Sequence, residues 1–249
     1  MDMRASPTAA PTSHSVARFD SRTTRLLLTA GMVGPALFIV VFLIESATRP
    51  GYSAWRNFVS QLSLSSQGWE QVANFLICGV LCVGFAMGLR RVLGSGTSAV
   101  AGPLAVAIFG ASLIVAGIFS TDPALGYPPG ATPVSGSPAL HGTPHAMIHG
   151  LAGLVCFVSL TVACFALARR FAGEMCWRGW AAYSILTGIV VVLGFVVSNA
   201  TSVLDMRGVW PNAPTGLVQR VAIIAGWVWL VLVAGRLLRD MRPGDAKQS

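Results

Sequence analysis

Two histidines four residues apart are the residues in this sequence best suited to chemistry. His145 and His149 share one face if this segment is helical, because residues i and i+4 are neighbours there. Such a pair can donate two ligands to one zinc or iron ion, with His141, Asp122 or Glu45 as a third. The three residues between the pair lack the glutamate of the zinc protease motif. Metal binding by His145, His149 and Asp122, a proton-relay or hydrogen-bonding role, and no chemical role all stay open, and zinc is possible but not favoured.

Other polar residues add to the candidates. The candidate catalytic residues are Asp122, His145, His149 and Glu45. A neutral carboxylic acid, Glu45 or Asp122, could protonate an apolar substrate such as a polyprenyl chain. The candidates for binding a ligand are Arg220, Gln219, Asn199 and Ser60. Each charged residue also has a structural interpretation. Arg220 could reach water or pair with a carboxylate, and Asp122, which precedes a proline, could simply end a helix.

The elements that must position these residues are six apolar runs. The chain is 54% hydrophobic and only 10% charged, far from the roughly 25% charged residues of a soluble domain. The runs are 26–44, 72–89, 99–119, 151–168, 180–197 and 215–235, and only the last contains a charge, Arg220. Each is long enough for a helix to cross roughly 30 Å of hydrocarbon. The sequence therefore predicts an all-α integral membrane bundle of six transmembrane helices.

The cations fix the predicted orientation. Thirteen of the 17 Lys and Arg residues lie before the first run, in alternate gaps, or at the end of the last run and beyond. The positive-inside rule then predicts that both termini are cytoplasmic. We expect the protein to lie in the cell (inner) membrane. We expect a disordered cytoplasmic tail over 1–24, a transmembrane domain over 25–240 and a cytoplasmic tail over 241–249. Membrane lipids are the expected partners, and the basic charge does not indicate nucleic acid.

With this orientation, the polar candidates gather at one level near the outer leaflet. The two loops on this side suggest how the outer face is covered. In the first outer loop, Trp55, Phe58, Val59 and Leu62 follow helical spacing, which indicates either an amphipathic element in the headgroup region or a cap on the helix ends. The second outer gap, 120–144, is rich in Pro and Gly and should be an irregular loop. Small residues crowd 102–117, so we expect that helix to be central in the bundle.

Several short motifs carry a resemblance to a known family. They are Arg49-Pro50-Gly51-Tyr52-Ser53, Val59-Ser60-Gln61-Leu62-Ser63, Phe119-Ser120-Thr121-Asp122-Pro123, the histidines at the start of the fourth helix, and Gln219-Arg220. In these motifs the chain resembles the family called domain of unknown function 998, over roughly residues 26–240. The resemblance implies a multi-pass membrane protein of bacteria or archaea and supplies no activity for any position.

The sequence favours a polar pocket in the outer leaflet that binds a lipid-like or isoprenoid amphiphile, with Arg220 and the histidines meeting its polar head. One alternative is a membrane-embedded enzyme acting on a lipid or polyprenyl substrate. It would be either a metal-dependent hydrolase or an acid-initiated cyclase or isomerase. Another is a structural accessory subunit whose polar groups only hold helices together.

Overall fold

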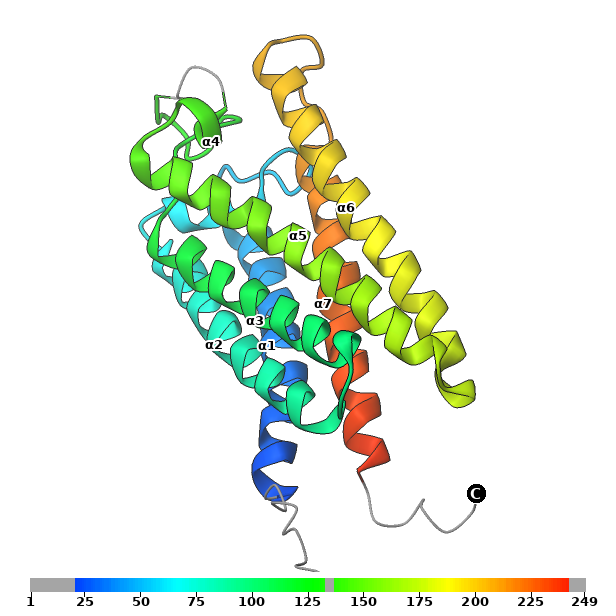
Figure 1. Ribbon diagram of the computed structural model, residues 1–249. Helices are drawn as coiled ribbons and strands as arrows, with labels where there is room; N and C mark the ends of the chain where they lie inside the picture. The colour runs from blue at the N-terminus through cyan, green and yellow to red at the C-terminus, as the bar shows by residue number, and fades with distance from the viewer. Residues whose placement is uncertain (1–20, 133–136, 242–249) are drawn as a thin grey trace, which may run out of the picture.

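The computed structural model describes residues 21–132 and 137–241 and is built from helices (Figure 1). In chain order these are α1 (Ser21–Thr48), the 3-10 helix η1 (Val59–Leu64), α2 (Trp69–Val92), α3 (Thr97–Ile118), α4 (Pro138–His141), α5 (Pro144–Ala172), the 3-10 helix η2 (Met175–Trp177), α6 (Arg178–Met206) and α7 (Thr215–Asp240). Six of them are long and apolar enough to cross a membrane, and the described residues form no strand. The predicted all-α bundle of six transmembrane helices is confirmed.

The chain ends differ slightly from the expected boundaries. Helix α1 begins at Ser21, so the last four residues of the predicted tail over 1–24 are helical. Met241 caps α7. The remainder of the two predicted tails, residues 1–20 and 242–249, lies outside the described residues.

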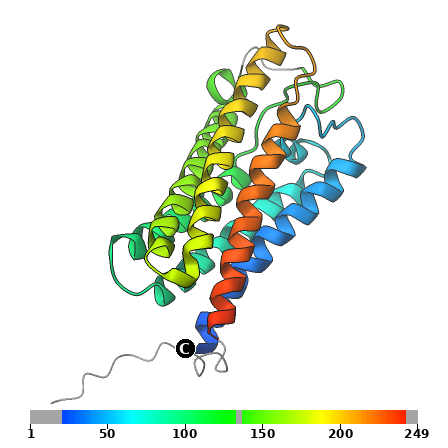
Figure 2. The same cartoon turned by 90° about the vertical axis from the view of Figure 1, so that its right-hand side faces the viewer.

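The six long helices form a closed ring in chain order. Each contacts its neighbours in the series α1, α2, α3, α5, α6, α7, and α7 returns to α1 (Figure 2). Short connections at 93–96 and 173–177 lie at the same end as the described chain ends, which we call the terminal end. The loops 49–68, 119–132 with 137–143, and 207–214 lie at the opposite end, the loop end.

The small residues of α3 serve close packing and do not place the helix at the centre. Helix α3 lies in the ring between α2 and α5. A Cβ atom added to Gly110 would lie 2.7 Å from the carbonyl oxygen of Gly79 on α2, and one added to Gly102 would lie 2.6 Å from Leu167 on α5. The expectation of a central helix was wrong because small faces are needed wherever two helices approach closely, including between neighbours in a ring.

Aromatic side chains fill the interior of the ring. Trp227 of α7 is buried, with its ring centroid 5.5 Å from that of Phe38 on α1, 4.8 Å from that of Phe109 on α3 and 6.4 Å from that of Phe157 on α5. Apolar side chains such as Val40, Leu104 and others cover the outside of the bundle, as expected for a surface that faces lipid. Aromatic rings from four helices therefore pack together at this level.

The first loop caps the ring. Its regular part is the six-residue η1, in which Val59 and Leu62 are buried, whereas Trp55 is 52% exposed. Gln61 is also buried, and its amide donates to the carbonyl of Ala124 in the second loop. Of the two interpretations of the apolar spacing, the structure shows the cap on the helix ends, because the loop's polar groups are satisfied by neighbouring loops.

Cys176 provides a test of orientation. It lies in η2 at the terminal end and is exposed, whereas Cys78, Cys82, Cys156 and Cys164 are buried. If the terminal end is cytoplasmic, as the arginines predict, a membrane-impermeant maleimide will label the protein in inverted membrane vesicles and leave it unlabelled in intact cells. Cys176→Ser is the control for site specificity. Labelling in intact cells would mean that the orientation is reversed.

Candidate functional site

Arg220 is a buried cation at the loop end of α7. It is 6% exposed, and its Nη1 and Nη2 groups donate to oxygen atoms of five residues. The acceptors are the carbonyls of Ala54, Asn57 and Gly216, at 2.8, 3.0 and 2.9 Å, the hydroxyl of Ser46, at 3.0 Å, and the hydroxyl of Tyr52. Among the described residues no carboxylate pairs with it. Arg220 therefore fastens the first loop to α7 through neutral acceptors.

Tyr52 completes this arrangement. Its ring lies under the guanidinium of Arg220, with 5.4 Å between the Cζ atom and the ring centroid. Burial raises the pKa of Tyr52 above its ordinary value, although the nearby Arg220 opposes the shift. The phenol therefore stays neutral, and while it accepts from Arg220 it donates to the carbonyl of Phe58, at 3.0 Å.

Two further arginines at the loop end pair with carboxylates. Arg49 Nη2 lies 3.0 Å from Glu45 Oε1 on α1 and 2.9 Å from Glu70 Oε2 on α2. Arg56 binds both carboxylate oxygens of Asp205 on α6, at 2.7 Å each, and this pairing raises the pKa of the Arg56 guanidinium. Glu45, a catalytic candidate from the sequence, thus forms a buried i,i+4 ion pair with Arg49 at the end of α1, and Arg49 links this end to α2 through Glu70.

Asp122 organises the start of α5. Its Oδ2 accepts from the backbone N–H of Thr143, at 2.6 Å, and its Oδ1 accepts from the Thr143 hydroxyl, at 2.8 Å. The hydroxyl oxygen of Thr143 accepts in turn from the backbone N–H of Ala146, at 3.3 Å, as an N-cap residue does. The carboxylate of Asp122 therefore holds the residue that caps α5.

His149 has one nitrogen occupied by the protein. Its Nδ1 lies 3.0 Å from the carbonyl oxygen of Ala116 and 2.8 Å from that of Phe119. Carbonyl oxygens only accept, so Nδ1 carries the ring proton and donates it. These carbonyls stand at the end of α3, where no following helical turn supplies an amide. His149 thus caps α3, and its Nε2 is left as a hydrogen-bond acceptor.

The second histidine of the pair lies apart from this role. His145 is exposed, with its ring 5.3 Å from that of Phe119, and His141 is exposed on α4. In the part of the chain that the structure describes, no group of three or more His, Cys, Asp or Glu side chains could hold a metal ion. The structure therefore does not bring His145, His149 and Asp122 together as a ligand set.

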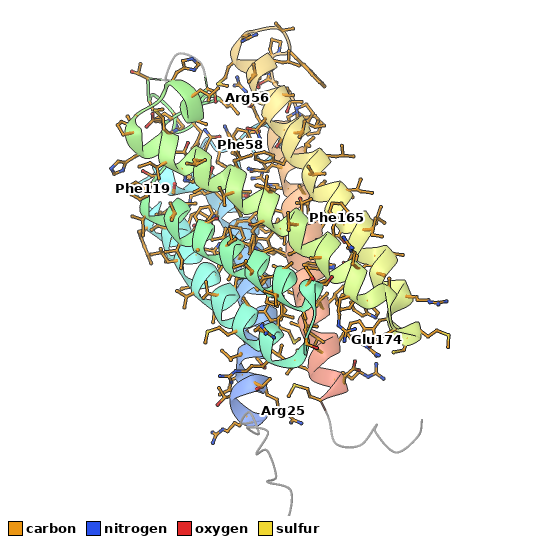
Figure 3. The ribbon with its side chains drawn as sticks, in the orientation of Figure 1. Arg25, Arg56, Phe58, Phe119, Phe165 and Glu174 are labelled. Atoms are coloured by element: carbon orange, nitrogen blue, oxygen red, sulfur yellow. The ribbon has the colours of Figure 1, made fainter. Side chains whose placement is uncertain are left out.

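A crevice at the loop end is lined by residues of α5 and α6 and by Phe58 of the first loop, which is labelled in Figure 3. The crevice has a volume of about 120 Å³. Its polar lining residues are Ser60, Gln61, Thr121, Ser137, His149, Asn199, Ser202 and Gln219. Among the described residues no Asp, Glu, Lys or Arg lines it. We call this hollow the α5–α6 crevice.

A second cavity of about 60 Å³ adjoins the crevice toward the bundle interior. The two share the lining residues Ser60, His149, Gly153, Phe157 and Gln219. The deeper cavity is otherwise lined mostly by apolar residues and reaches Trp227. The hollow therefore has a polar mouth at the loop end and an apolar floor.

The structure brings four sequence candidates together and leaves the others apart. Ser60, His149, Asn199 and Gln219 line the α5–α6 crevice, although they come from three helices and a loop. Arg220, Glu45, Asp122 and His145 are not among its lining residues. Sequence reasoning missed Gly153, Phe157 and Phe195, which supply the opening and the apolar wall. Nothing in the local sequence separates them from other apolar positions in a transmembrane helix.

These features define a class: a multi-pass membrane protein with six spanning helices and a capped, partly polar loop end. Residues 32–236 match the family described as Protein of unknown function (DUF998), and the chain belongs to this family. The resemblance inferred from the loop motifs is confirmed. The chain matches no curated protein and no solved structure.

Replacing Arg220 should destabilise the loop end. Arg220→Ala removes the donor to the buried carbonyl of Asn57 and to the partly buried carbonyl of Ala54, so we expect a loss of about 2 kcal/mol in unfolding free energy. Thermal unfolding in detergent measures it. Arg207→Ala, which removes an exposed cation after α6, should change stability by less than about 0.5 kcal/mol. Equal effects of the two substitutions would contradict the anchoring role.

Replacing His149 should separate its capping role from its free nitrogen. His149→Ala removes the donor to the carbonyls of Ala116 and Phe119, with an expected loss of about 1–3 kcal/mol. His149→Asn places an amide N–H where Nδ1 lies and should retain most of the stability. Thermal unfolding of the two variants side by side measures this, and equal losses would show that the cap does not depend on a donor at Nδ1.

Proposed function

We propose that this protein binds a lipid-like or isoprenoid amphiphile in the α5–α6 crevice. The observation that carries the proposal is the polarity of the hollow, which is polar at its mouth and apolar toward Trp227. An amphiphile has the same polarity along its length. Ligand sites in membrane and soluble proteins alike combine an apolar wall with a few convergent polar groups.

The crevice is suited to entry from the membrane. Gly150 and Gly153 on α5 are half-buried, and Asn199 on α6 is exposed, so the hollow reaches the surface of the bundle between the two helices. A Cβ atom on Gly153 would meet nothing within 4 Å. A chain could therefore enter sideways from the bilayer without unfolding either helix.

The size of the hollow favours a slender chain. An apolar cavity of about 150 Å³ takes up a molecule the size of benzene, and here the volumes are about 120 and 60 Å³. These volumes suit the first part of a linear alkyl or isoprenoid chain and its polar end.

The proposed site has a defined position in the membrane. With the arginine-rich terminal end in the cytoplasm, the crevice lies at the level of the outer leaflet of the cell (inner) membrane. The protein's partners are then membrane lipids and one amphiphilic small molecule. The carboxylate of Asp122 accepts from Thr143 through both oxygens, and Glu45 Oε1 accepts from Arg49, so both carboxylates have structural partners.

Filling the crevice should abolish binding without unfolding the protein. Gly153→Leu projects a side chain into open space in the hollow. With octadecanol brominated at mid-chain as the probe, we expect quenching of Trp227 fluorescence in the wild type and its loss in Gly153→Leu. Trp227→Phe identifies the contribution of Trp227. Val158→Leu, on the exposed face of α5, is the matched control and should bind normally. Quenching that survives Gly153→Leu would contradict the proposed site.

A further inference from the structure

We infer that the polar end of the bound amphiphile is an uncharged hydroxyl, so that the ligand is a linear or isoprenoid long-chain alcohol. This inference rests on the proposed function, since it concerns the α5–α6 crevice. It depends on three properties of the lining: its charge, its free acceptor and its free donor.

The lining offers no counter-charge to an ionic head. In the described part of the chain, its residues include no Lys or Arg. Two nearby cations already have partners: the Nη groups of Arg220 donate to five oxygen atoms, and Arg56 binds both carboxylate oxygens of Asp205. A phosphate or carboxylate in this hollow would lose its hydration without gaining an ion pair, which is strongly unfavourable. An uncharged head has no such cost.

The free acceptor is Nε2 of His149. Because Nδ1 donates to the carbonyls of Ala116 and Phe119, the ring proton is on Nδ1 and Nε2 carries a lone pair. His149 lines both the crevice and the deeper cavity. A ligand that meets Nε2 favourably must donate a hydrogen bond. Ketones, ethers and esters cannot do this.

The free donor is the side-chain amide of Gln219. Its Oε1 accepts from the backbone N–H of Val59, at 2.8 Å, which fixes the orientation of the amide. The Nε2 of Gln219 is then left to donate, and Gln219 lines the same two cavities as His149. A hydroxyl placed between them donates to His149 and accepts from Gln219 through one oxygen atom.

The distance along α7 matches the chain. Gln219 and Trp227 are eight residues apart on one helix, or about 12 Å at 1.5 Å per residue. The deeper cavity is lined by Phe38, Phe75 and Trp227 over this depth. A head held at Gln219 thus places the middle of a long chain near Trp227.

Three probes with the same chain test the inference on the purified full-length protein. They are octadecanol, its methyl ether and octadecanoate, each dibrominated at mid-chain, with quenching of Trp227 fluorescence as the readout. We expect octadecanol to bind at least about tenfold more tightly than the ether or the carboxylate, as for one unpaired buried hydrogen-bonding group. His149→Asn, which keeps a donor to α3 but lacks Nε2, should reduce the affinity for octadecanol to that of the ether.

Gln219→Glu is the second variant. It retains an oxygen acceptor for the N–H of Val59 but has no amide donor, and it should also weaken octadecanol binding. Equal binding of the three probes, or preference for octadecanoate, would overturn the inference and leave the proposed function standing if Gly153→Leu still blocks binding. Failure of all three probes to quench Trp227 in the folded protein would overturn both.

Discussion

The loop end depends on the requirement that a buried guanidinium and buried carbonyls satisfy each other. Arg220 donates to the carbonyls of Ala54 and Asn57, and the bond to Asn57 is buried. Gly216 allows this approach, because a Cβ atom there would collide with the carbonyl oxygen of Asn57. In a medium of low dielectric constant an unpaired polar group is costly. Arg220 is therefore a principal contact between the first loop and the bundle.

The position of this loop creates the crevice. Arg220 holds the loop against α7, and Arg56 holds it against α6 through Asp205, so that Phe58 and Ser60 stand at the opening between α5 and α6. The second loop is attached to the first, because the side-chain amide of Asn57 donates to the carbonyl of Leu125, at 3.0 Å. The two loops thus form one cap over the hollow.

The charged and the neutral polar residues of the loop end have different roles. Charges at membrane depth cost roughly 2.5–3.5 kcal/mol on insertion scales, so they are tolerated where each finds partners. Arg49 and Arg56 pair with carboxylates, and Arg220 donates to carbonyls and hydroxyls. The neutral residues His149 and Gln219 retain unused hydrogen-bonding capacity toward the hollow. The chemistry offered to a ligand is therefore that of uncharged groups.

The sequence by itself determined the six spanning helices and their all-α class, because each apolar run must satisfy its own backbone hydrogen bonds in lipid. Its loop motifs indicated the family. It also indicated that His149, Asn199 and Gln219 lie at one level, with Ser60 in the first outer loop. Only the tertiary structure decided that these four line one hollow. It also decided that Glu45, Asp122 and Arg220 bind other parts of the helices and loops. Depth follows from position in a helix, but partners depend on helix rotation and loop path. Those are set by contacts between residues far apart in the chain.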